Sequence, residues 1–301
     1  MSAFTYRSYG LTVQSDLALP ELTPTRPGGA IDVTVRIGAV PERLEQPTGR
    51  GVLYEANAEA FLLRMAGVAR YLVSSGRDIV IEPAEGSTQD DIRVFLVGSC
   101  FGALLHQRKM LVLHAAAIRV DRGAVLFAGQ SGAGKSTLLS AMLERGHPMM
   151  VDDVCGVVMA DGRPQVLPGY PRTRLWADSA ARLDIATDEL PRTRPSLEKF
   201  ERQVPAQFWD TEAPLHCLYV LTSSNEAEIK IDLLPRVDAF STVLFNTYRR
   251  QFVEGLEMGV DHFTLASTVA TSTTIKRVVR PAAGFDITGL ADMIEADIER
   301  S

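Results

Sequence analysis

The eight residues Gly129–Ser136, Gly-Gln-Ser-Gly-Ala-Gly-Lys-Ser, match the whole G-x-x-x-x-G-K-[ST] pattern of a phosphate-binding loop. Glycines let successive backbone N–H groups curl around phosphate oxygens, and the start of a following helix adds partial positive charge. In such a loop Lys135 reaches the β- and γ-phosphates, and the Ser136 hydroxyl coordinates Mg²⁺. The sequence therefore predicts a site for a nucleotide and Mg²⁺ formed by Gly129, Gln130, Ser131, Gly132, Ala133, Gly134, Lys135, Ser136 and Thr137.

Two adjacent carboxylates, Asp152 and Asp153, follow the short apolar segment Met149–Val151 soon after the loop. Beside a phosphate-binding loop, one carboxylate can hold the metal while the other accepts a proton from an attacking hydroxyl. Neighbouring residues of a strand point to opposite faces, so both can face one site only if the strand has ended there. The alternative is a solvated pair at a strand end with no chemical role.

Other features narrow the class of nucleotide-binding protein. No Asn/Thr-Lys-x-Asp motif for reading a guanine base is present, which disfavours a GTPase. The acidic strand follows the loop too soon for a transport ATPase, and the short interval favours a compact phosphotransferase. His114 lies in the apolar segment Leu111–Ala117 just upstream. It is either a hydrogen-bonded core histidine or part of the site.

The apolar pattern around these residues predicts the elements that position them. Ala124–Ala128 is a continuous apolar strand, as expected for a sheet that is covered on both faces. Lys135–Glu144 is a helix that begins where the loop ends, and Met149–Val151 is another strand. Asp161-Gly162 marks the turn of a following hairpin. A loop between a buried strand and a helix is the setting that phosphate binding requires.

The front third of the chain has a different pattern. It holds short alternating segments such as Ile31–Ile37, separated by prolines and glycines, and a hairpin within Tyr71–Glu82. Asp90-Asp91 can cap a helix with apolar residues at a 3–4 spacing. We therefore expect a β-rich domain over residues 1–105, for acceptor binding or assembly, and an α/β kinase domain over residues 106–301.

The remainder predicts helices, strands and one long loop. Helices are expected over Arg174–Leu183, Ala239–Met258, Phe263–Ala270 and Ile287–Arg300, and strands over Leu215–Leu221, Ile229–Leu234 and Lys276–Arg280. The stretch Asp184–Ser196, which holds two prolines and mixed charges, is expected to be a loop that could cover the acceptor.

Composition excludes several classes of protein. The chain has 301 residues, 46% of them hydrophobic, and a net charge of −6, which argues against a general nucleic-acid partner. Its longest apolar stretch, Val94–Leu105, is too short for a membrane-spanning helix, which needs about 20 residues. Cys100, Cys155 and Cys217 are dispersed and fit a reducing compartment. With no apolar signal core, the expected location is cytoplasmic and free of membrane.

Three segments together resemble the catalytic core of HPr kinase/phosphorylase: His114-Ala-Ala-Ala, the loop Gly129–Ser136, and Arg145-Gly-His-Pro-Met-Met-Val-Asp-Asp. The resemblance covers about Leu111–Pro168. It implies an α/β fold with a P-loop kinase core of the HPr kinase/phosphoenolpyruvate carboxykinase type, and transfer of the γ-phosphoryl group of ATP to a serine hydroxyl. It further implies that Asp152 acts as the base, that Ser136 and Asp153 hold Mg²⁺, and that His114 belongs to the active site.

Departures from that family shape the expected substrate. The front third differs, and the chain after Gly169 lacks the segment associated with the phosphorylase reaction, so we expect a kinase without strong reverse activity that does not act on HPr. The layout is similar to HPr-kinase-like proteins of bacterial peptide-maturation clusters, with Tyr6, Tyr9-Gly-Leu and Leu19–Leu22 at the front. Some of these resemble lasso-peptide precursor kinases. That likeness implies a peptide acceptor, the terminal serine of a lasso precursor. The resemblance to HPr kinase/phosphorylase implies a homo-oligomer.

The acceptor site is less marked in the sequence. Arg172, Arg174 and Lys199 are candidates to contact the transferred phosphate or a peptide carboxylate. Acidic residues nearly balance this basic stretch, so a solvated surface of mixed charge is the alternative. Two other functions stay open: phosphorylation of another protein, a sugar or a small molecule, and nucleotide sensing without transfer. The acidic pair disfavours the sensor, because a pure binder has no need for a second carboxylate.

Overall fold

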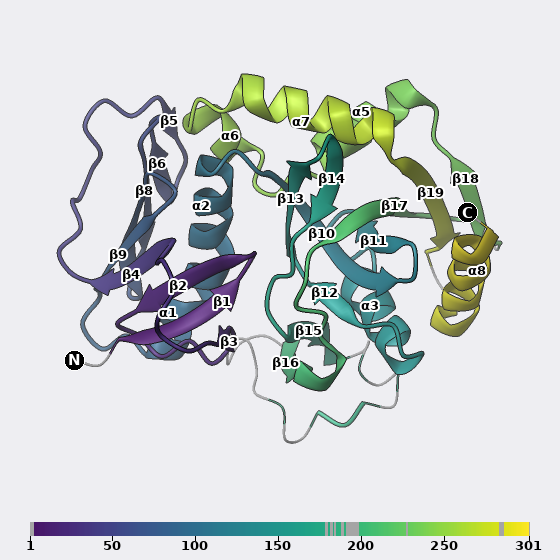
Figure 1. The fold of residues 1–301 in the computed structure, drawn as a ribbon, viewed down its shortest axis with the longest axis horizontal. Coiled ribbons are helices and arrows are strands. Elements are labelled where there is room, and N and C mark those ends of the chain that lie inside the picture. The colour runs from purple at the N-terminus through teal and green to yellow at the C-terminus, as the bar shows by residue number, and fades with distance from the viewer. Residues whose placement is uncertain are drawn as a thin grey trace.

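The computed structural model describes residues 3–177, 180, 183, 185–187, 190, 199–226, 228–282 and 286–300. Within these residues the chain is mixed α/β, with a nine-stranded front sheet from the N-terminal part of the chain at the left of Figure 1, an eight-stranded sheet at the right and a small two-stranded sheet. No helix in the described part of the chain is long and apolar enough to cross a bilayer.

The front sheet has the strand order β3-β1-β2-β4-β9-β8-β7-β6-β5. Buried and partly exposed residues alternate along β2 and β8, so one face of the sheet forms core. The predicted hairpin within Tyr71–Glu82 is confirmed as β8 and β9, with Ser75-Gly76 at its turn. The strands are β1 (Phe4–Ser8), β2 (Leu11–Ser15), β3 (Thr23–Pro24), β4 (Val33–Ile37), β5 (Gly49–Arg50), β6 (Tyr54–Ala56), β7 (Ala60–Met65), β8 (Ala69–Ser74) and β9 (Asp78–Pro83).

The second sheet has the order β11-β10-β13-β14-β17-β19-β18, with β12 paired to β10 and β11 also paired to β17. The pairings of β17 with β11 and with β19 are parallel. Its strands are β10 (Leu111–Val120), β11 (Gly123–Ala128), β12 (Met149–Val151), β13 (Val154–Ala160), β14 (Arg163–Val166), β17 (Ala213–Ser224), β18 (Lys230–Leu233) and β19 (Thr274–Pro281).

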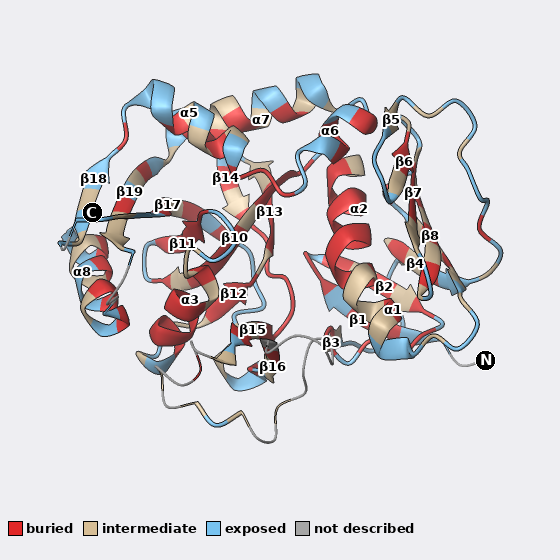
Figure 2. Cartoon of the chain, turned by 180° about the vertical axis from the view of Figure 1, so that it is seen from behind, coloured by how far each residue is buried: buried red, intermediate tan, exposed pale blue. Residues whose placement is uncertain are grey.

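Helices cover both faces of this sheet, as the continuous apolar run of β11 predicts (Figure 2). Val125 and Phe127 pack into a cluster with α3 and α8, whereas Leu126 and Ala128 belong to the larger cluster that includes α5 and α7. The helices are α3 (Lys135–Glu144), α5 (Arg236–Phe245), α6 (Gln251–Gly255), α7 (Gly259–Ser272) and α8 (Ile287–Arg300), with a 3₁₀ turn over Pro205–Gln207.

One continuous helical rod stands between the two large sheets (Figure 1). It consists of α1 (Gln89–Phe95), a π-helical segment (Leu96–Cys100) and α2 (Phe101–Gln107). Thr88 caps it, accepting a hydrogen bond from the Asp91 amide, so the cap lies just before the predicted acidic pair. Its buried residues join one apolar cluster that reaches both sheets. The predicted division at residue 105 falls inside α2 and stays a prediction.

Two helix predictions need correction. Arg174–Trp176 lie in strand β15 (Arg172–Trp176), which pairs with β16 (Lys199–Gln203), a partner that local periodicity does not reveal. Of the rest of Arg174–Leu183, only residues 177, 180 and 183 are described, and most of the predicted loop Asp184–Ser196 lies outside the described residues. The predicted helix Ala239–Met258 is interrupted between α5 and α6. There Thr247 forms an antiparallel β-bridge with Leu113 of β10. This backbone pairing takes the place of the hydrogen bonds that would continue the helix.

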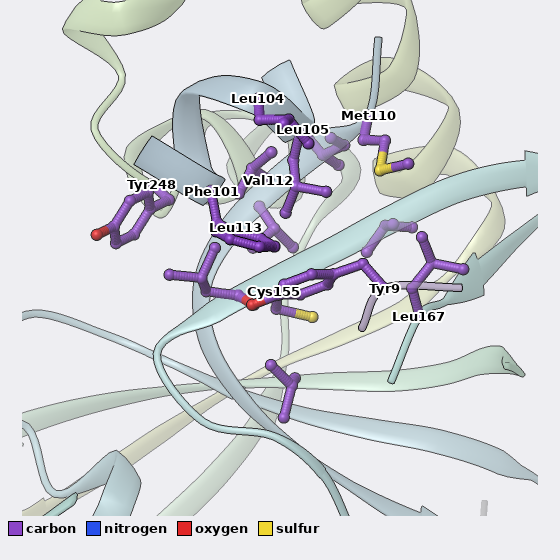
Figure 3. Packing of buried hydrophobic residues seen from close by; sticks show 14 of the residues in the cluster. Tyr9, Phe101, Leu104, Leu105, Met110, Val112, Leu113, Cys155, Leu167 and Tyr248 are labelled. Carbon is purple, nitrogen blue, oxygen red and sulfur yellow. The ribbon is translucent and has the colours of Figure 1, made fainter. Parts of the chain in front are cut away.

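The interruption is fixed to the helical rod by His106. Its Nε2 lies 2.9 Å from the Tyr248 carbonyl oxygen, and the Tyr248 ring packs on Gly102, where a Cβ would lie 2.6 Å from the ring. Figure 3 shows Tyr248 at the edge of the cluster that contains Phe101 and Leu113. The rod and the segment after α5 therefore hold one another in place.

Burial of His106 makes the free energy of unfolding depend on pH. Burial lowers the pKa of His106 to about 4, from an ordinary value of 6.5. The unfolded chain therefore binds the proton first, so stability is fully present above the unfolded pKa and is lost as pH falls from about 6.5 toward 4. We expect this residue to remove roughly 1–2 kcal/mol between about pH 7 and pH 5, measured by urea denaturation. His106→Gln should flatten the profile, and an unchanged profile in that variant would contradict the assignment.

Candidate active site

The loop between β11 and α3 has the backbone that its glycines allow. Gly129, Gly132 and Gly134 have φ angles of 142°, 83° and 100°, and Gly134 directly precedes α3. A Cβ on Gly129 would lie 2.6 Å from the carbonyl oxygen of Leu221, at the parallel strand β17. The predicted loop thus lies between a buried strand and a helix, with its amide groups at a helix N-terminus, which is the arrangement that suits an anion.

Two cations contact the loop from different elements. The Lys135 ammonium donates to the carbonyl oxygens of Gly129 (2.8 Å) and Gln130 (3.1 Å), so its charge sits over the loop. Arg280 of β19 donates through Nε to the Ala133 carbonyl oxygen at 3.1 Å. Sequence analysis did not single out Arg280, because only the parallel pairing of β17 with β19 brings it to the loop. The loop therefore carries positive charge from its own lysine and from a distant arginine.

Asp152 is buried, with 6% of its surface exposed, and accepts three hydrogen bonds. Its Oδ1 accepts from the Ser136 hydroxyl at 3.0 Å, and its Oδ2 from the Thr173 hydroxyl (2.8 Å) and the Arg174 amide (2.9 Å). These donors come from α3 and β15. The Asp152 carboxylate is thus fixed beside the hydroxyl of Ser136, so the two side chains are placed to coordinate the same metal ion.

Asp153 faces another way because its backbone leaves the strand. Its φ of 85° is rare for a residue with a side chain and marks the end of β12. The His114 Nδ1 lies 2.9 Å from Asp153 Oδ1 and 3.2 Å from the Asp153 carbonyl oxygen. Both oxygens are acceptors, so Nδ1 carries a hydrogen. The carboxylate is about a third exposed and is held by a histidine from β10, the residue whose sequence context left its role open.

The three predicted acceptor contacts are placed differently. Arg174 Nη1 lies 3.8 Å from Asp153 Oδ2, and its Nε lies 3.4 Å from Glu201. Burial acts to lower the pKa of Arg174, but the charges of Tyr170, Asp153 and Glu201 outweigh it, and the pKa is raised. Arg172, with 3% of its side chain exposed, is paired with Glu21 and Glu201 instead. Lys199 begins β16 opposite Trp176, and its side chain lies outside the described residues.

Two adjoining cavities flank the loop and share Gly129, Gln130, Ser131, Phe245 and Asn246. The larger, of about 830 Å³, opens over the end of β17 and includes Arg277 and Arg280; we call it the β17 lobe. The smaller, of about 620 Å³, includes His114, Asp153, Tyr248 and Arg249; we call it the His114 lobe. Burial raises the pKa of Tyr248 to about 12, so its hydroxyl stays protonated. Together the lobes leave room for one molecule on each side of the phosphate-binding loop.

The donors beside the loop fit magnesium better than a metal held by protein alone. No group of three or more His, Cys, Asp or Glu side chains with metal-binding geometry occurs among the described residues. The Ser136 hydroxyl and the Asp152 carboxylate, 3.0 Å apart, are oxygen donors. Mg²⁺ commonly takes one or two such protein ligands and completes its shell with water and substrate phosphates. The residues present therefore fit a Mg²⁺ that arrives with a nucleotide.

Comparisons with known proteins give distant similarity. No protein-family model matches the chain, and no curated protein matches it. Among solved structures, the HPr(Ser) kinase/phosphatase from Coxiella burnetii is similar over 63% of this chain and 94% of its own, with 13% sequence identity and a TM-score of 0.34. At this TM-score the likeness is too distant to define the activity, which has to be inferred from the residues of the site.

The close approach at Gly129 gives a stability test of the loop. Gly129→Ala should lower the free energy of unfolding by about 2–4 kcal/mol, because the new Cβ meets the Leu221 carbonyl in a strained backbone conformation. Gly132→Ala is the matched control: its φ is also positive, but a Cβ there meets nothing within 4 Å, so the cost should be about 1–2 kcal/mol. Chemical denaturation measures both. Equal costs would mean that loop and β17 do not approach as closely as described.

Proposed function

We propose that the protein is an ATP-dependent kinase that transfers the γ-phosphoryl group to a hydroxyl, with the serine of a peptide as acceptor. The observation that carries the proposal is the division of the acidic pair. Asp152 is bound to the loop serine Ser136, whereas Asp153 lines a separate lobe together with His114. A metal-holding carboxylate and a proton-accepting carboxylate on two sides of one phosphate-binding loop suit phosphoryl transfer to a hydroxyl.

Within this proposal, the loop amides and Lys135 bind the phosphates of ATP. Mg²⁺ would be held by Ser136 and, directly or through water, by Asp152, and when bound it would neutralise charge on the phosphates. To bind the phosphates, the Lys135 ammonium has to leave the carbonyl oxygens of Gly129 and Gln130 and donate to phosphate oxygens instead. This needs only a short movement of a flexible side chain. The likeness of these segments to HPr kinase/phosphorylase supports a P-loop kinase core of that type.

The resemblance to HPr kinase/phosphorylase implies that Asp152 is the base and that Asp153 holds Mg²⁺. The geometry favours the opposite assignment. Asp152 is buried and already accepts three hydrogen bonds, two of them on Oδ2, so it is less well placed than Asp153 to receive a proton from an acceptor. Asp153 is more exposed and lines the lobe beside the loop. We therefore assign the base to Asp153: the acceptor hydroxyl gives it a proton, the oxygen bonds to the γ-phosphorus, and the bond to the β–γ bridging oxygen breaks to release ADP.

His114 and Arg174 assist on either side of that base. His114 donates from Nδ1 to Asp153 and so fixes the direction of the carboxylate. Arg174 lies 3.8 Å from the other oxygen of Asp153, within reach of charge that develops on the transferred group. Arg172, enclosed by Glu21 and Glu201, is assigned no contact with the acceptor.

The choice of acceptor rests on sequence likeness to lasso-peptide precursor kinases, which favours a terminal serine. Incubation with γ-labelled ATP and a panel of serine-terminated peptides, HPr, sugars and water separates the alternatives. Label on a peptide supports the proposal, and label on a sugar or on HPr replaces the acceptor. Nucleotide binding with no transfer to any of them would favour the sensor.

Separate substitutions test the two carboxylate roles. We expect Asp153→Asn to lower kcat by about 10²–10⁴-fold with little change in nucleotide binding, because the proton acceptor is lost. Asp152→Asn should instead weaken binding of Mg·ATP, because the anchor of Ser136 and the metal-side charge are lost. Asp161→Asn, at the hairpin turn between β13 and β14, is the control and should behave like wild type.

Steady-state kinetics and calorimetric binding of a non-hydrolysable ATP analogue distinguish the outcomes. A loss of kcat in Asp152→Asn with normal nucleotide binding, together with a near-normal Asp153→Asn, would restore the assignment that the family resemblance implies.

A further inference from the structure

The segment Asn246–Arg249 follows α5 and is fixed along the edge of β10. The His114 amide donates to the Asn246 carbonyl oxygen at 2.8 Å, and the Tyr248 amide to the Val112 carbonyl oxygen at 2.8 Å. Thr247 Oγ1 lies 2.9 Å from His262 Nε2 of α7. Three elements therefore determine where the next residue, Arg249, presents its side chain.

Arg249 has features of a functional rather than a structural arginine. Its φ of 48° is in the left-handed region, which is uncommon for a residue with a side chain and clusters at functional sites. The guanidinium lies 5.8 Å from the Tyr248 ring centroid and 6.0 Å from that of Phe252. Among the described residues, no carboxylate lies within ion-pair distance of it. The Tyr248 and Phe252 rings thus contact a positive charge that no carboxylate in the described part of the chain neutralises.

This charge faces the lobe where the proposed base lies. Arg249 and Asp153 both line the His114 lobe, and within its described lining Arg249 is the one permanently charged cation. The His114 ring, which holds Asp153, lies 6.0 Å from the same Tyr248 ring that Arg249 covers. A short stretch of peptide, at about 3.3–3.6 Å per residue, can therefore reach both groups.

We propose that Arg249 binds a carboxylate of the acceptor, next to the hydroxyl that is phosphorylated; this inference rests on the proposed kinase function. Asp153 repels any anionic acceptor from the lobe, and Arg249 offsets that repulsion. The planar guanidinium can form two parallel hydrogen bonds to a carboxylate, which fixes direction as well as charge. The carboxylate is either the α-carboxylate of a terminal serine or the side chain of a neighbouring acidic residue.

Three ten-residue peptides distinguish these sources: one that ends in serine with a free carboxylate, the same peptide as the C-terminal amide, and the amide with aspartate before the serine. Arg249→Gln removes the charge. Arg250→Gln is the matched control, because Arg250 is also exposed but does not line the lobe. For each pair, kcat/KM for phosphorylation and the dissociation constant from fluorescence anisotropy are measured.

We expect wild type to prefer a carboxylate-bearing peptide to the plain amide by about 10- to 100-fold, the range for a hydrogen bond between charged groups. Arg249→Gln should abolish this preference and leave the plain amide changed by less than about 3-fold. Arg250→Gln should retain the preference. A preference for the free acid identifies a terminal serine, and a preference for the aspartate peptide identifies a side-chain carboxylate.

The inference fails if wild type treats acid and amide alike, or if Arg249→Gln slows all three peptides equally. Failure of the proposed function looks different, because wild type then transfers phosphate to none of the peptides. In that case the anisotropy measurements still decide the matter: tighter binding of a carboxylate-bearing peptide that depends on Arg249 supports the assignment, and equal binding of all three overturns it.

Discussion

The candidate site depends on the hydrogen bonds that converge on the Asp152 carboxylate. A buried carboxylate is costly unless donors replace its lost water, and here α3 supplies one donor and β15 supplies two. The same contacts fix Ser136 at the start of α3 and set the position of Arg174 beside Asp153. Removal of the Asp152 carboxylate would therefore disturb Ser136, strand β15 and, through Arg174, the surroundings of Asp153. Asp152 itself contacts only Ser136 and β15.

Strand β15 extends that dependence to the front of the molecule. Arg172, two residues before Arg174, pairs with Glu201 and with Glu21 of the front segment, and Glu21 also accepts from Arg93 of α1 at 2.9 Å. The Nε and Nη2 atoms of Arg172 have no hydrogen-bond partner among the described residues. Buried ion pairs of this kind add little net stability but penalise any other arrangement. The network thus fixes how the front sheet meets β15 more than it strengthens the fold.

Local patterns in the sequence predicted what local physics determines. The glycines of the loop, the apolar run of β11 and the helix from Lys135 are contiguous; the helix has its predicted bounds, and β11 begins one residue earlier than predicted. The acidic pair was predicted at a strand end, but the direction of each side chain follows from the positive φ of Asp153, which no pattern encodes. Long-range pairing explains what was missed: Arg174–Trp176 of β15 fall in a predicted helix, because their partner strand β16 lies more than twenty residues further along the chain.

Residues of the candidate site that the sequence analysis missed share that cause. Arg280 reaches the loop through the parallel pairing of β17 and β19, and Thr173 reaches Asp152 through β15. Tyr248 and Arg249 lie in what the periodicity predicted as the interior of one helix, and bridging to β10 interrupts it. A residue that serves a site through a neighbouring strand carries no local signal, since its own neighbours in the sequence are chosen for other contacts.

The net charge of −6 offers an anion no long-range attraction, so the proposed binding rests on local groups. A polyphosphate and an anionic acceptor are both repelled by an acidic protein at long range, but at physiological ionic strength exposed charges are screened beyond about 8 Å. Under the proposed function, binding is therefore decided by the groups within that distance: loop amides, Lys135 and Arg280 on one side, Arg174 beside Asp153, and Arg249 in the His114 lobe. Each cation is held by backbone carbonyls, carboxylates or aromatic rings, so the positive field is in place before a substrate arrives. An acidic chain can therefore host phosphate chemistry, provided that its few basic residues are fixed where the anions must lie.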